Sequence, residues 1–131
     1  MENQLLKDEV FGDYISIYTR QQAIEDGTLI DVSSMAKEAG IKFPVALTRT
    51  VWSKYVEVPA NVTCQDEAGR LWDIIWMLKM EIHRSGGGDI VNFKVYVRNS
   101  AGRPRLETLK AVCGPGDNPE PVITIMLPNE D

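Results

Sequence analysis

The longest regular pattern in the chain lies in residues 66–84, where apolar side chains recur at helical spacing. This stretch contains no proline, and its glycine, Gly69, lies in the first turn, so no residue type interrupts a helix in its interior. At about 100° per residue, the charged side chains fall on one narrow wedge and the apolar ones cover most of the remaining circumference. We therefore predict a long central core helix that is covered on more than one side.

After the glycines at residues 86–88 the hydrophobic period changes to two. In residues 90–98 apolar and polar side chains alternate, which is typical of a strand with one buried face. Two more strands are expected at 106–112 and 122–127, each preceded by a turn-rich segment. The last strand is nearly continuous in apolar residues, which predicts burial on both of its faces.

Shorter elements are expected ahead of the long helix. Residues 14–18 alternate as in a short strand. Thr19 and Gln22 have the spacing of a capping box, which predicts a helix over residues 20–25. Residues 29–32 are expected to form a second extended piece.

Two further short helices are predicted between this piece and the long helix. Ser33 or Ser34 is suited to cap the first, which runs through Ala39 and is stopped by Gly40. The second covers residues 44–56, because proline suits a first helical turn and the following apolar residues fall at helical spacings.

These elements together predict an α+β fold. A C-terminal three-stranded antiparallel meander is packed by the long central helix, and several short helices lie toward the N-terminus. A chain of 131 residues with 44% apolar side chains is expected to form a single domain over residues 1–131, with a core that needs no metal or disulfide. We expect residues 1–10 to be frayed and residues 128–131 to form an acidic tail.

The charge of the chain is unevenly distributed. The formal net charge is −5, made up of −5 in residues 1–40, +4 in residues 41–110 and −4 in residues 111–131. An acidic protein with a basic middle is not an obvious general DNA binder, although it has the means to present a local basic surface.

Membrane insertion and export are not expected. The longest apolar run, residues 74–78, is far below the roughly 20 residues that span a bilayer, and the N-terminus lacks the basic and apolar parts of a signal peptide. The two cysteines, Cys64 and Cys113, do not form a disulfide framework. These features predict a cytoplasmic protein with reduced thiols.

Several segments of the chain also resemble a known family. They are YTRQQAIEDG at 18–27, FPVALTR at 43–49, RLWD at 70–73, KAVCGPGD at 110–117 and VITIMLP at 122–128. Together they resemble an uncharacterised family of small bacterial proteins that are often carried on plasmids, integrative elements and phages. The family has no assigned activity, cofactor or catalytic residue. The resemblance therefore implies only a context, an accessory protein of mobile DNA that binds a host or invader macromolecule, including one that inhibits a defence system.

Cys113 is the candidate nucleophile. It precedes a Gly-Pro-Gly turn at the end of a predicted strand, and a cysteine at such a junction acts as a nucleophile when a base activates it. His83, the one histidine of the chain, is the candidate base. Because nothing in the sequence ties the two together, we favour the alternative, a packed thiol in a hairpin.

A second candidate site is an aromatic stripe on the long helix, formed by Trp72, Trp76, Lys79 and His83. Helical projection places these side chains on one side, where they are able to stack a base or clamp an anion. The more common role of such aromatic residues is in a core, with the lysine stem lying along apolar surface.

The third candidate is a basic hairpin formed by Lys94, Arg98, Arg103, Arg105 and Lys110. Arginines on a two-stranded ribbon are able to reach phosphates or bases. The alternative is a solvated outer face that discourages edge pairing. The acidic ends of the chain offer the converse, an imitation of a nucleic-acid backbone.

The sequence thus favours a non-enzymatic accessory protein that binds a protein or nucleoprotein partner. The alternatives are a small enzyme that uses Cys113 and a nucleic-acid-binding protein that uses residues 94–110. We expect no cofactor and no metal, since the cysteines and the histidine lack ligand spacing. A homo-oligomer is compatible with the sequence.

Overall fold

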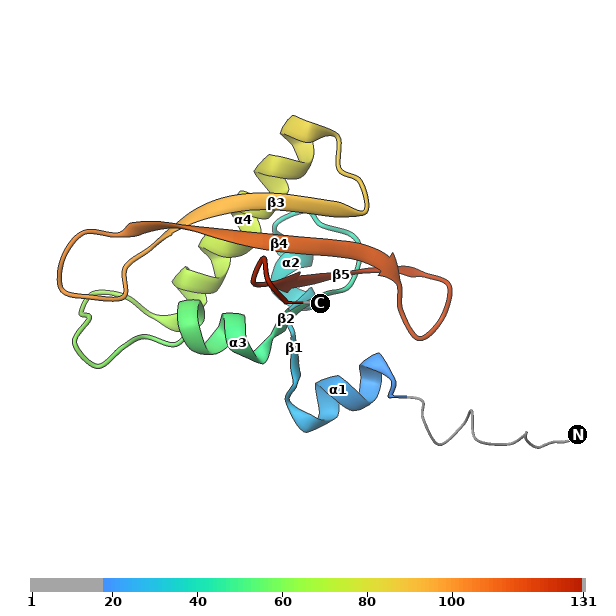
Figure 1. Cartoon of the computed structure of the whole chain (residues 1–131), viewed down its shortest axis with the longest axis horizontal. Helices are drawn as coiled ribbons and strands as arrows, with labels where there is room; N and C mark the ends of the chain where they lie inside the picture. Colours follow the sequence, from blue (N-terminus) through green and yellow to red (C-terminus); the bar gives the residue numbers. More distant parts are fainter. Residues whose placement is uncertain (1–17, 131) are drawn as a thin grey trace, which may run out of the picture.

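A computed structural model describes residues 18–130 of the chain (Figure 1). Its strands form one five-stranded mixed sheet in the order β1-β2-β5-β4-β3. In chain order the elements are α1 (Arg20–Asp26), β1 (Leu29–Asp31), α2 (Ser33–Glu38), β2 (Val45–Thr48), α3 (Arg49–Val51), the π-helix η2 (Trp52–Val56), α4 (Glu67–Ser85), β3 (Ile90–Val97), β4 (Arg105–Pro115) and β5 (Pro121–Met126). The α+β class and the long helix on the sheet are as predicted.

The predicted C-terminal meander is present. β3 pairs with β4 and β4 pairs with β5, both antiparallel. The inner face of β3 carries buried valines and Phe93, and its outer face is exposed, because α4 packs against the inner face alone. β5 lies inside the sheet between β4 and β2, but Val122 and Thr124 on its outer face are only half-buried. Its predicted burial on both faces is therefore incomplete.

The prediction of a helix over residues 44–56 is wrong in its first part. Val45, Ala46 and Leu47 are completely buried in β2, which pairs in parallel with β5 and antiparallel with β1. A short apolar run does not distinguish a buried strand from a buried helix. The helical part begins after Thr48, whose hydroxyl accepts a hydrogen bond from the Val51 N–H at 3.3 Å. The meander is thereby extended into a five-stranded sheet.

The long helix α4 begins and ends close to its predicted limits. Asp66 is its N-cap and accepts from the Gly69 N–H at 2.7 Å. Ile74, Ile75 and Leu78 are completely buried beneath a cover made by β3, η2 and α2. The buried face of α4 is narrower than its apolar arc predicts. Trp76 on this helix is 38% exposed, and Met77 and Met80 are exposed to a similar degree.

The N-terminal helices differ slightly from expectation. The capping box of Thr19 and Gln22 is present at the start of α1. Ser33 does not cap α2; it is the first residue of that helix, and its hydroxyl contacts Asp31 and the Val45 backbone instead. The strand predicted at residues 14–18 lies almost wholly outside the described residues.

Long-range hydrogen bonds attach both ends of the described chain to the sheet. The carboxylate of Asp117 accepts from the backbone N–H groups of Arg20 and Gln21, at 2.7 and 3.0 Å, which fastens α1 to the β4–β5 turn. At the other end, the Glu130 carboxylate accepts from the Thr48 hydroxyl and from the Leu127 N–H. This part of the predicted acidic tail therefore folds back onto the sheet.

Candidate functional site

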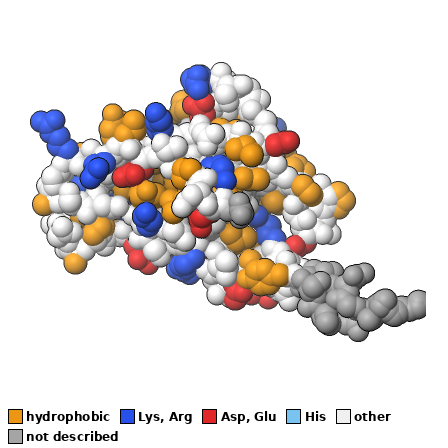
Figure 2. Space-filling view, in the orientation of Figure 1, with side chains coloured by type: hydrophobic (Ala, Val, Ile, Leu, Met, Phe, Trp, Pro, Cys, Tyr) orange, Lys and Arg blue, Asp and Glu red, His pale blue; other side chains and the backbone are white. Residues whose placement is uncertain are grey.

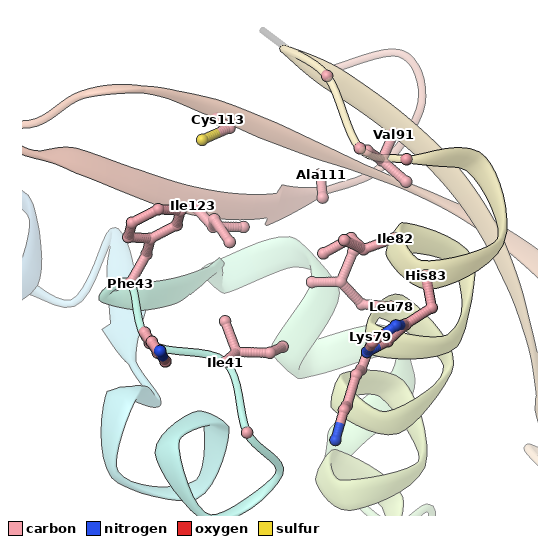
Figure 3. A pocket seen from close by; sticks show the side chains of 15 residues that line it. Ile41, Phe43, Leu78, Lys79, Ile82, His83, Val91, Ala111, Cys113 and Ile123 are labelled. Atoms are coloured by element: carbon pink, nitrogen blue, oxygen red, sulfur yellow. The ribbon is translucent and has the colours of Figure 1, made fainter.

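An apolar cleft with a volume of about 420 Å³ opens beside the C-terminal half of α4 (Figure 3). Its walls come from α4, from the segment after α2 and from the inner face of the sheet. The lining residues are Gly40, Ile41, Lys42, Phe43, Leu78, Lys79, Ile82, His83, Gly86, Gly87, Gly88, Val91, Ala111, Cys113 and Ile123. A volume of this size is typical of sites that accept a small ligand or a protein side chain.

The cleft exists because small residues line it where larger ones would fill the space. Gly86, Gly87 and Gly88 all have positive φ, at 84°, 86° and 123°, a backbone that glycine adopts without strain. They turn the chain from α4 into β3 without a side chain on the rim. Opposite them, Ala111 contributes only a methyl group. The sheet and the helix therefore separate at this end without closing.

Gly40 fixes the second wall. Its φ is +97°, and a Cβ atom at this position would lie 2.9 Å from the Nζ of Lys79. The lysine side chain therefore crosses directly over the end of α2. Only glycine allows so close an approach here without displacing the ammonium group.

Both residues of the predicted catalytic pair line the cleft, but on different walls. Cys113 lies on β4 and is half-buried, whereas His83 lies on α4 and is exposed. Figure 3 shows their side chains well apart, with Ile82, Val91 and Ala111 between the two walls. No hydrogen bond joins the thiol and the imidazole in the described structure, so the geometry provides no activated nucleophile.

Three of the four residues of the predicted aromatic stripe contact one another in sequence along α4. The rings of Trp72 and Trp76 stack with centroids 5.9 Å apart and planes 17° from parallel. The Lys79 ammonium lies 5.0 Å from the centroid of the Trp76 ring, within the range of a cation–π interaction. Trp72 packs against the core, and the exposed His83 ends the stripe at the cleft. The stripe thus places Lys79, which also lines the cleft, against the Trp76 ring.

The polar character of the cleft is confined to its edge. Lys42, Lys79 and His83 are the lining residues with a basic side chain, and none of the lining residues is acidic. An apolar lining that includes two lysines and no acidic residue suits an occupant that combines an apolar group with a carboxylate.

The five residues of the predicted basic hairpin do not form one surface. Arg98 donates to the carbonyls of Gly102 and Thr63, at 3.2 and 3.1 Å, and so holds the β3–β4 loop in place. Lys110 donates to the Glu130 carbonyl at 2.6 Å. Two of the five side chains are therefore engaged within the fold.

The remaining three, Lys94, Arg103 and Arg105, are exposed. In the strand register Arg105 lies opposite the inward-facing Val97, whereas Lys94 lies on the outer face. Figure 2 shows lysines and arginines scattered among apolar and uncharged groups on the visible face. The described structure thus offers no continuous basic stripe along the hairpin.

Arg70 is a central residue that sequence reasoning does not single out. Only 6% of it is exposed. Its guanidinium donates to the carbonyls of Tyr55 and Arg98, at 3.0 and 2.8 Å, and to the side chains of Gln65 and Asn99, at 2.9 and 2.6 Å. Burial lowers the pKa of Arg70 below its usual value.

The family of the chain is shown by its sequence. Residues 8–131 match the model of a family of unknown function, DUF6573. The chain belongs to this family. Its description assigns no activity and makes no connection to mobile elements or phages. No curated protein and no solved structure matches the chain significantly.

Two further observations concern only residues 18–130. Nowhere in that range do three or more histidine, cysteine, aspartate or glutamate side chains come together as a metal site would require. The same range contains no helix with the length and hydrophobicity needed to cross a membrane.

Proposed function

We propose that this protein is a non-enzymatic binding module that takes an apolar side chain of a partner protein into the cleft beside α4. The observation that carries the proposal is the chemistry of the cleft, an apolar interior with basic residues at its edge and no acidic lining. Binding energy in protein interfaces concentrates where a large side chain enters a desolvated pocket. The occupant is expected to be an aromatic or large aliphatic side chain next to an acidic residue.

The magnitudes are consistent with this role. Complete burial of one large apolar side chain contributes about 1.5–3 kcal/mol, which is a typical contribution of an anchor residue. Lys42 and Lys79 at the edge favour a neighbouring carboxylate and disfavour a basic one. The cleft therefore supplies both part of the affinity and a preference for acidic partners.

The experiment introduces a charge into the cleft without changing the fold. Ile82 is half-buried in the cleft wall on α4, and glutamate is a good helix former. Ile82→Glu is expected to abolish capture of a partner from a bacterial lysate by the tagged protein. The control is Ala68→Glu on the exposed side of the same helix, which adds the same charge outside the cleft and should leave capture unchanged.

The capture is carried out with and without nuclease, and circular dichroism confirms that both variants are folded. A partner that both variants retain equally would contradict the cleft proposal. A partner that nuclease removes would support the nucleic-acid alternative, for which affinity should also fall steeply with rising salt. The sequence resemblance implies an accessory protein of mobile DNA, and the identity of the captured partner would test that context.

The second candidate function is that of a small enzyme that uses Cys113. The observation that favours it is that this thiol and His83 line the same cleft. The test compares the rates at which iodoacetamide labels the two cysteines at neutral pH. Cys64 is exposed and Cys113 is half-buried, so accessibility alone predicts faster labelling of Cys64. Faster labelling of Cys113, together with loss of function in Cys113→Ser, would support the enzyme.

A further inference from the structure

The two edges of the sheet differ in length and exposure. β1, at one edge, has three residues, whereas β3, at the other, has eight and no proline. Within the described structure β3 pairs only with β4. A long edge strand presents backbone N–H and C=O groups that are free to pair with another strand.

The register identifies which backbone groups of β3 are free. The Cys113 N–H donates to the Asp89 carbonyl at 2.8 Å, and these two residues continue the pairing in which Ile90 faces Val112. Hydrogen-bonded pairs alternate along an antiparallel ladder, so the odd-numbered residues of β3 bond to β4. The even-numbered residues direct their N–H and C=O groups toward the free edge. These are Ile90, Asn92, Lys94 and Tyr96.

Apolar side chains flank this edge on both faces of the sheet. On the outer face Ile90 is 58% exposed and Tyr96 is 67% exposed. On the inner side Met77 and Met80 of α4 lie exposed beside β3. A groove runs between the helix and the strand, and its lining residues are Met77, Met80, Glu81, Arg84, Asn92, Phe93 and Lys94. Exposed apolar groups gathered along a free edge are typical of an interaction site.

We infer that β3 accepts an extended segment of a partner protein as a sixth strand of the sheet. Alternate side chains of such a segment point to the two faces. Those on the inner face pack against Met77 and Met80, and those on the outer face lie beside Ile90 and Tyr96. Lys94 makes no hydrogen bond or ion pair to any other described residue, and its position in mid-strand favours an acidic side chain opposite it.

The helix favours a single strand over a second copy of this chain. In Figure 1 the C-terminal end of α4 projects past β3 on the side of the free edge. A two-fold pairing of β3 with the same strand of another molecule would bring a second projecting helix end into the same space. An isolated extended segment has no such helix and enters the groove between α4 and β3 without this conflict.

This site is separate from the cleft. The groove beside β3 is lined by Met77, Met80, Glu81 and Arg84 of α4, whereas the cleft is lined by Leu78, Lys79, Ile82 and His83 of the same helix. No α4 residue is shared between the two sites, so the inference at β3 stands or fails independently of the proposed function.

The test uses the full chain and two soluble peptides that alternate valine and threonine. One peptide carries glutamate at its centre and the other carries lysine. The measurement is amide hydrogen exchange of β3 by NMR, at a peptide concentration about ten times the dissociation constant. The amides of Ile90, Asn92, Lys94 and Tyr96 are expected to exchange about tenfold more slowly with the glutamate peptide, whereas the odd-numbered amides are protected already.

Two variants sharpen the test. Asn92→Pro removes one free N–H from the edge but none from the ladder with β4, and proline is tolerated at such positions. Binding should fall by at least about tenfold while the fold is retained. Lys94→Glu should reverse the preference between the two peptides, and Arg103→Glu, with the same charge change in the exposed loop, should not. Ile82→Glu in the cleft should leave peptide binding unchanged.

Three results would overturn the inference. The first is unchanged exchange of the even-numbered amides at saturating glutamate peptide or up to its solubility limit. The second is equal binding by Asn92→Pro and the native chain. The third is slower exchange with rising protein concentration in the absence of peptide, which would identify a second copy of the chain as the occupant.

Discussion

The two ends of α4 are held in opposite ways. Near its N-terminus, Arg70 donates hydrogen bonds to the η2 segment, to the connector before α4 and to the β3–β4 loop. Near its C-terminus the helix is followed by three glycines with positive φ and borders an apolar cleft. One end is held by directional polar contacts, and the other end leaves space between helix and sheet.

The difference indicates where the fold is stabilised and where it is available for binding. The buried guanidinium of Arg70 bonds to three segments at once. Removal of the guanidinium or of one of its partners leaves buried polar groups unpaired. An apolar cleft has no buried polar groups that need partners, and burial of an apolar group in it is favourable.

The largest effect is expected for Arg70→Ala. Hydrogen bonds from a charged donor contribute about 1.5–3 kcal/mol each, and the carbonyls of Tyr55 and Arg98 would lose their partner, so we expect a loss of about 3 kcal/mol or more in the free energy of unfolding. Urea denaturation measures it. Arg103→Ala, on an exposed side chain, is the control and should leave the midpoint almost unchanged. Equal midpoints for the two variants would show that Arg70 is not a structural fastening.

A smaller loss in the free energy of unfolding is expected for a substitution at the cleft wall. In Gly40→Ala the positive φ imposes strain of about 1–2 kcal/mol, and the new Cβ must displace the Lys79 ammonium. Tryptophan fluorescence should change as well, because Lys79 lies over the Trp76 ring. Gly86→Ala is the matched variant, with positive φ but nothing within 4 Å of the added Cβ. Its free energy of unfolding should fall by about 1 kcal/mol without the change in fluorescence.

Removal of the N-cap is expected to have an effect of similar or smaller size. Asp66→Ala removes the acceptor of the Gly69 N–H and should lower the free energy of unfolding by about 1 kcal/mol. The loss should appear as faster amide exchange in the first turn of α4, near Arg70, and not beside the cleft. Asp66→Ser retains a capping oxygen and should recover most of the loss.

The smallest effect concerns pH at the C-terminal end of α4. The hydrogen bond from Arg84 holds the pKa of the Glu81 carboxyl below its usual value. An acid with a lowered pKa in the folded state stabilises the fold above its unfolded pKa, and this contribution is lost as the pH falls through the folded pKa. Because the pair lies at the surface, solvent screening keeps the contribution small. An NMR titration of Glu81 should show its pKa rise in Arg84→Ala; an unchanged pKa would contradict the pairing.

Much of the fold follows from local patterns. The period of two in β3, the capping box of Thr19 and Gln22, and the apolar arc of α4 each specify an element through neighbouring residues, and the structure contains all three. The error at residues 45–48 has the opposite origin. Val45, Ala46 and Leu47 are a short apolar run that fits either a buried helix or a buried strand, and it becomes a strand because β5 and β1 pair with it.

The candidate sites show the same division. The stacking of Trp72 and Trp76 was predictable, because both lie on one helix four residues apart. The sequence did not show that the basic hairpin fails to form one surface. Arg98 and Lys110 donate to the carbonyls of Thr63 and Glu130, which are distant in the sequence. The meeting of Cys113 and His83 at one cleft likewise depends on how β4 and α4 pack.

By itself, then, the sequence determined the overall class and most of the local elements, since these depend on periodicity, capping and turn residues within a few positions. Tertiary structure alone decided that the meander gains two strands, that Arg70 joins three segments, and that glycines and an alanine leave a cleft unfilled. Such features depend on contacts between residues far apart in the chain, and the free energy of those contacts has no counterpart in the local pattern.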